Sequence, residues 1–93
     1  MSSIDAPIRQ YVEKIQALAV KALDGEDVAN RLEQTVRDAL HHFGVVVGVD
    51  KNACAREFRR QLNQIARLTH ESQPAYRQAM QEAASHVPES SLN

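Results

Sequence analysis

The sequence predicts an all-α fold, a small four-helix bundle-like domain, on two observations. Apolar residues recur at steps of three and four through most of the chain, which is the spacing of a helix that buries one face. Three breaks interrupt this pattern, near Asp24-Gly25, Gly44–Asp50 and Ser72–Pro74, and they divide the chain into four segments. With 93 residues and no internal repeat, a single domain over 1–93 is expected.

The core of this domain is expected to be thin. Hydrophobic residues make up 43% of the chain, but only two Phe and two Tyr contribute aromatic bulk, and many of the others are alanine. A small domain of this kind often gains the missing burial by associating with another chain. Dimerisation is therefore predicted to complete the bundle.

The first helix is expected over 5–23. Asp5 is placed to cap its start, and Pro7 is tolerated in the first turn, where a backbone amide has no carbonyl to bond. Asp24-Gly25 is expected to end the helix, because glycine adopts the left-handed conformation found at many helix termini. The apolar stripe consists of Ile4, Ile8, Tyr11, Val12, Ile15, Leu18, Ala19 and Ala22.

The second helix is expected over 26–44. Glu26 or Asp27 begins it, since a carboxylate suits the positive end of a helix dipole. The apolar stripe consists of Val28, Leu32, Val36, Ala39, Leu40 and Phe43.

A valine-rich run follows, with the sequence Gly44-Val45-Val46-Val47-Gly48-Val49. Its β-branched residues lower helix propensity, and it is too short to span a membrane. No other segment resembles a strand that would pair with it. We interpret the run as a crossover between helices, as the turn of a helix-turn-helix, or as a segment that meets a partner. Pairing with the same run of a second copy, as a short ribbon, is a further alternative.

The third helix is expected over 51–71, capped by Asp50 or Asn52. Gln61 lies inside its apolar stripe. Because a buried amide needs hydrogen-bond partners, Gln61 is expected at the rim or bonded across an interface. The stripe consists of Cys54, Phe58, Leu62, Ile65 and Leu68. The basic face of this helix is formed by Lys51, Asn52, Arg56, Arg59, Arg60 and Arg67.

Ser72-Gln73-Pro74 separates the third helix from a fourth, expected over 74–87, since proline suits the first turn of a helix. Residues 88–93 are expected to form a short frayed tail. The apolar face of the fourth helix consists of Tyr76, Ala79, Met80, Ala83 and Val87.

The chain lacks the residue patterns of catalytic and metal sites. His41 and His42 are adjacent, so on a helix they point about 100° apart and do not share one ion easily. The sequence contains no Glu-x-x-His, His-x-x-x-His or Cys-x-x-Cys. Cys54 lies on the apolar stripe between two alanines, which indicates a buried structural thiol rather than a nucleophile. We therefore expect no enzyme, no metal and no cofactor.

The net charge and the cysteine content limit which partners and which cell compartment are expected. A net charge of -1 argues against a protein that binds nucleic acid through charge alone. The charge is uneven, since residues 1–50 hold five basic and eight acidic side chains, whereas residues 51–93 hold six basic and four acidic ones. One cysteine excludes an intramolecular disulfide and fits a reducing compartment. With no secretory start and no membrane span, a cytoplasmic location is expected.

Residues 43–60 resemble helix-turn-helix DNA-binding proteins. That family has a small residue before the turn, a glycine in it, an apolar residue just after it, and another apolar residue early in the second helix. In this chain the four are Gly44, Gly48, Val49 and Cys54. Glu57 departs from the pattern, because the family has an apolar residue there. The resemblance implies a DNA-binding transcriptional regulator whose groove-facing residues are Lys51, Asn52, Ala55, Arg56 and Arg59.

The function favoured by the sequence is nevertheless a small, non-enzymatic protein–protein interaction module, an adaptor, antiactivator or inhibitor, which forms a homodimer. The thin core, the unpartnered valine-rich run and the near-neutral charge favour it over the DNA-binding alternative. Tyr11 or Tyr76 is expected to anchor the interface if it is only half-buried in the monomer. The other predicted interface residues are Val45, Val46, Val47 and Val49. The basic face of the third helix is expected to meet protein or DNA.

Overall fold

The computed structural model describes residues 5–45 and 50–88, which form helices and, within those ranges, no strand. The all-α, four-helix prediction is confirmed, whereas completion of the bundle by dimerisation stays a prediction. The helices are α1 (Asp5–Leu23), α2 (Ala29–Val45), α3 (Lys51–Leu68) and α4 (Pro74–Ser85).

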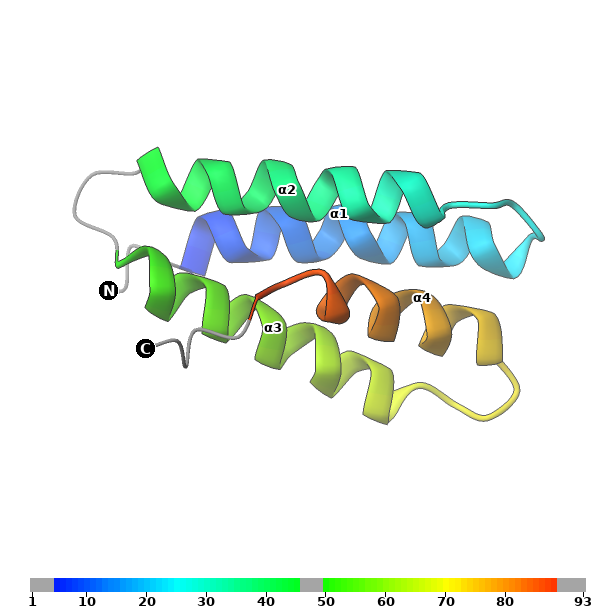
Figure 1. Ribbon diagram of the computed structural model, residues 1–93. Coiled ribbons are helices and arrows are strands. Elements are labelled where there is room, and N and C mark those ends of the chain that lie inside the picture. The colour runs from blue at the N-terminus through cyan, green and yellow to red at the C-terminus, as the bar shows by residue number, and fades with distance from the viewer. Residues whose placement is uncertain (1–4, 46–49, 89–93) are drawn as a thin grey trace.

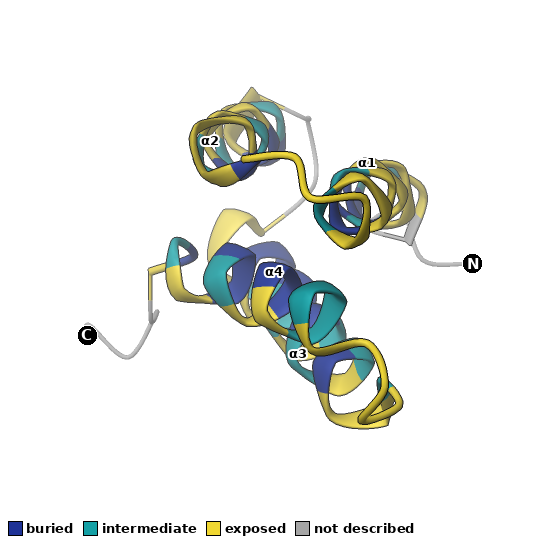
Figure 2. Cartoon of the chain, turned by 90° about the vertical axis from the view of Figure 1, so that its right-hand side faces the viewer, coloured by how far each residue is buried: buried dark blue, intermediate teal, exposed yellow. Residues whose placement is uncertain are grey.

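Successive helices run in opposite directions and make two helical hairpins, α1–α2 and α3–α4 (Figure 1). One hairpin lies over the other, and Figure 2 shows the α3–α4 hairpin inclined to the first, with the buried residues turned inward. Every helix contacts the other three, so all four contribute to one core. Among the described residues no charged or amide side chain is buried in that core.

A Schellman motif ends α1 at the predicted place. The Gly25 amide donates to the Ala22 carbonyl at 3.0 Å, and the Glu26 amide donates to the Lys21 carbonyl at 3.2 Å. Gly25 has φ = 91°, the left-handed conformation that a residue with a Cβ adopts only with strain. The expected helix end at Asp24-Gly25 is therefore confirmed.

The start of α2 differs from the expectation of residue 26. The motif at the end of α1 still includes Glu26, and the Asp27 carboxylate accepts a hydrogen bond from the Ala29 amide at 3.1 Å. The helix begins at Ala29 as a result. Val28 precedes the helix and is buried in the core, so the apolar pattern begins before the helix does.

Caps also shorten the other two helices relative to the expected ends at 71 and 87. Asp50 rather than Asn52 caps α3, because its carboxylate accepts from the amides of Asn52 and Ala53 at 2.9 and 3.2 Å. At the other end Thr69 is extended, and Arg77 of α4 donates to the Thr69 carbonyl at 2.6 Å. Tight turn bonds close α4 after Ser85, with the His86 amide donating to the Ala83 carbonyl at 3.1 Å.

Three aromatic rings join three helices at one end of the core. The Phe43 ring of α2 meets Tyr11 of α1 and Phe58 of α3 edge-to-face, with centroids 6.0 and 5.5 Å apart. The Tyr11 hydroxyl lies 3.2 Å from Nδ1 of His42, which ties α1 to α2 a second time. Aromatic pairs in this geometry are worth about 0.5–1.5 kcal/mol beyond the area they bury.

Small residues let α4 lie close to the other helices. Its buried side chains are three alanines and one methionine, Ala79, Met80, Ala83 and Ala84, and Val87 is buried just beyond the helix. Leu68 was placed in the apolar stripe of α3, and this was wrong, because Leu68 is 76% exposed. The helix ends there, so no further turn of α3 and no part of the core covers the side chain.

Two glycine substitutions are expected to have opposite effects on stability. Gly25→Ala places a Cβ at a positive φ and should cost about 1 kcal/mol of the free energy of unfolding. Gly44→Ala lies within α2, where the added Cβ would meet, among the described residues, the Lys51 side chain at 3.5 Å, an ordinary contact. It should raise stability by about 0.5 kcal/mol through helix propensity. Urea unfolding of the two variants measures both, and equal effects would contradict the assigned backbone conformations.

Candidate functional site

The predicted dimer interface lies partly outside the described residues. Val46, Val47 and Val49 fall between the two described ranges, whereas Val45 ends α2 with its side chain 63% exposed. Tyr11 does not meet the condition set for an anchor, because it is only 7% exposed and is packed on His42 and Phe43. Tyr76 is partly buried against the core, and its role as an anchor stays a prediction.

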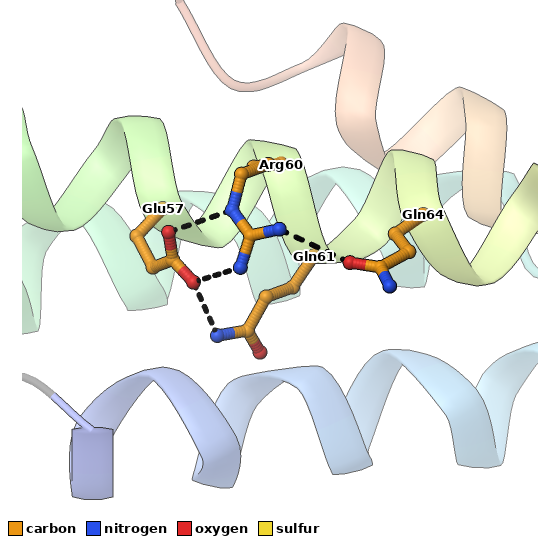
Figure 3. Close-up of polar contacts among 4 residues, drawn as sticks. All are labelled: Glu57, Arg60, Gln61 and Gln64. Carbon is orange, nitrogen blue, oxygen red and sulfur yellow. Dashed lines mark hydrogen bonds and ion pairs between the residues drawn. The ribbon is translucent and has the colours of Figure 1, made fainter.

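An acidic side chain neutralises part of the basic face of α3. Arg60 donates from Nε to one Glu57 oxygen at 2.8 Å and from a terminal nitrogen to the other oxygen, a bidentate pair (Figure 3). Gln61 also donates to Glu57, at 2.9 Å, and Gln64 accepts from Arg60 at 3.1 Å. The hydrogen bond from Arg60, reinforced by that from Gln61, lowers the pKa of Glu57 to about 2.

Gln61 therefore takes the first of its two expected places. Its side chain is partly buried at the rim, and its amide is bonded within α3 rather than across an interface. Figure 3 shows it on the side of α3 that faces α1.

The rest of the basic face is only partly open to solvent. Arg56 and Arg67 are exposed, but Arg59 is partly buried. The Lys51 stem lies over Gly44 at the end of α2, where a cation suits the negative end of the helix dipole. Ala55 was expected to face a DNA groove, and this was wrong, because Ala55 is buried against the core. One of the five groove-facing residues is thus closed off by the bundle itself.

A groove between α1 and α3 was not predicted. It has a volume of about 390 Å³, with Val12 and Ile65 as its apolar residues. Its polar residues are Arg9, Glu13, Gln16 and Gln61. The signal in the sequence was the placement of residues 9, 13 and 16 at helical spacing beside Val12 of the apolar stripe.

Three exposed apolar side chains lie at one end of the bundle and are called the apolar end here: Val20, Leu23 and Leu68. Val20 is 51% exposed in the last turn of α1, and Leu68 is the last residue of α3. The C-terminal ends of α1 and α3 lie at the same end of the molecule, opposite the end of α2 that carries Val45 (Figure 1). This grouping depends on the fold and could not be read from the sequence.

The cysteine and two of the histidines, which are the side chains considered for catalysis or metal binding, are buried or hydrogen-bonded within the protein. Cys54 is fully buried, and its burial raises the pKa of the thiol to about 11, which keeps it protonated. His42 bonds the Tyr11 hydroxyl, and Nδ1 of His70 accepts from the Ser72 amide at 3.0 Å. Across the described ranges no three His, Cys, Asp or Glu side chains are placed to hold a metal ion. None of the described helices has the length and apolar character needed to cross a membrane.

Comparison of the chain with protein-family models, with curated proteins and with solved structures found no match in any of the three.

The Glu57–Arg60 pair is expected to make stability depend on acid pH. Because the pKa of Glu57 is lowered on folding, its contribution is complete above about pH 4.5 and is lost as pH falls toward about 2. The pair is on the surface, so screening by solvent keeps its contribution to stability small. Urea unfolding from pH 5 to pH 2 should show a smaller loss of stability for Glu57→Gln than for the wild type.

Arg60→Gln is the matched control, since it removes the same hydrogen bonds from the other side. It should flatten the pH dependence less than Glu57→Gln does, because the hydrogen bond from Gln61 to the Glu57 carboxylate stays in place. Parallel curves for the wild type and both variants would contradict the pairing.

Proposed function

We propose that this chain is a small, non-enzymatic helical module that acts by binding another protein, as an adaptor, an antiactivator or an inhibitor. The observation that carries the proposal is the apolar end, where Val20 and Leu23 are exposed at the end of α1 and Leu68 is exposed at the end of α3. Large apolar side chains exposed at one end of a small protein favour a protein-binding surface there.

The surroundings of the apolar end support a protein partner. Lys21, Asp24 and Arg67 are exposed beside it in the sequence and carry charges of both signs. Apolar contacts within a charged rim are the usual composition of a transient protein interface. Val45 is exposed at the other end of the bundle. We include it, with the valine-rich run that it belongs to, as a second surface for a protein partner.

Duplex DNA remains the alternative partner. Exposed Arg56 and Arg67 on α3 favour it. Two contacts reduce that support, because Ala55 is buried and Glu57 holds Arg60 in a bidentate pair. A cytoplasmic location belongs to the same proposal, since the single free cysteine suits a reducing compartment.

Capture from the native cell tests the proposed function. Tagged wild-type protein should retain a specific protein, and Leu68→Glu should lose it, because the variant puts a charge into the apolar contact. Gln81→Glu is the matched control, since it adds the same charge at an exposed position of α4 and should retain the partner. Circular dichroism checks that both variants keep their helices.

Titration with duplex DNA separates the two partners. The proposal predicts negligible binding at physiological salt. Binding that falls steeply with salt, and is lost in Arg56→Ala with Arg67→Ala, would instead establish the DNA-binding alternative, because each neutralised phosphate releases counterions.

A further inference from the structure

The α1–α3 groove presents charges of both signs one helical turn apart. Arg9 and Glu13 line it from α1 and are both exposed. In the described part of the chain neither side chain makes a hydrogen bond or an ion pair. An arginine that precedes a glutamate by four residues is also the less favourable order for pairing within one helix. Both charges are therefore available to a second molecule.

We propose that the α1–α3 groove is a self-association surface that takes a second copy of the chain. The two α1 helices lie antiparallel about a two-fold axis that passes midway between Arg9 and Glu13. Arg9 of each copy then faces Glu13 of the other, so one kind of pair forms twice. Such an interface is self-complementary, which is what a two-fold dimer requires.

The remaining lining of the groove suits the same occupant. Ile65 and the small exposed part of Val12 form the apolar lining of the groove, and Gln16 and Gln61 carry amides that both donate and accept. Gln61 already donates to Glu57, and this bond holds its side chain at the groove. A second copy in the antiparallel arrangement places its Glu13 opposite Arg9 and its Arg9 opposite Glu13. A partner surface with charges of a single sign would instead repel one of these two side chains.

The dimer is expected to be weak and sensitive to salt. Its charged pairs lie at an exposed surface, where screening reduces their contribution. The inference is separate from the proposed function, because the groove lies along α1 and α3 whereas the apolar end lies at their C-terminal ends.

Charge exchange between copies tests the dimer directly. Sedimentation or light scattering at high micromolar concentration and low salt should show a dimer of the wild-type chain. Arg9→Glu alone and Glu13→Arg alone should each weaken it at least about tenfold, because both pairs across the axis become repulsive. An equimolar mixture of the two variants should form a heterodimer, since every contact across the axis is then opposite in sign.

The chain with both substitutions should dimerise like the wild type, because the two charges have only changed places. Val45→Asp is the control for the valine-rich run and should leave the dimer intact. Loss of the dimer in Val45→Asp, with retention in Arg9→Glu, would overturn the proposal and place the interface at the end of α2. A wild-type chain that stays monomeric, or a mixture that does not associate, would also overturn it. None of these outcomes depends on capture of another protein.

Discussion

The edge-to-face contacts of Tyr11, Phe43 and Phe58 are the interaction on which the rest of the bundle depends. The chain has only four Phe and Tyr residues in all, and three of them meet here, one from each of α1, α2 and α3. Large rings reach across a gap between helices that alanine cannot fill. Because the rings set the spacing of three helices, α4 needs only small side chains to complete the core, and its buried face is mostly alanine.

The small number of large side chains in the core explains where the candidate surfaces lie. The fourth helix, α4, is short, and Val20, Leu23 and Leu68 stay exposed at the C-terminal ends of α1 and α3. Along the side, α1 and α3 contact each other but leave a groove at their surface. Both surfaces follow from a core too small to cover all the apolar residues of the longer helices.

Much of this fold could be predicted because helix periodicity and end signals are local. Gly25 ends α1 and Asp50 caps α3 through residues within one turn of each. The predictions that were wrong concern which side chains the neighbouring helices bury. Leu68 matches the apolar repeat, yet the helix ends there and leaves it exposed, and Ala55 was assigned to the outside although the bundle buries it. The groove likewise needs the position of α3 relative to α1, which spacing along one helix does not contain.

A double-mutant cycle on the ring contact tests the central claim most directly. Phe43→Leu, Phe58→Leu and the double variant keep an apolar side chain at each position, and urea unfolding gives the three changes in the free energy of unfolding. If the edge-to-face contact sets the packing of the helices, the double variant should be less destabilised than the sum of the single changes, by about 0.5–1.5 kcal/mol. Changes that add to within about 0.3 kcal/mol would contradict it, and would show that the two rings contribute only the area each of them buries.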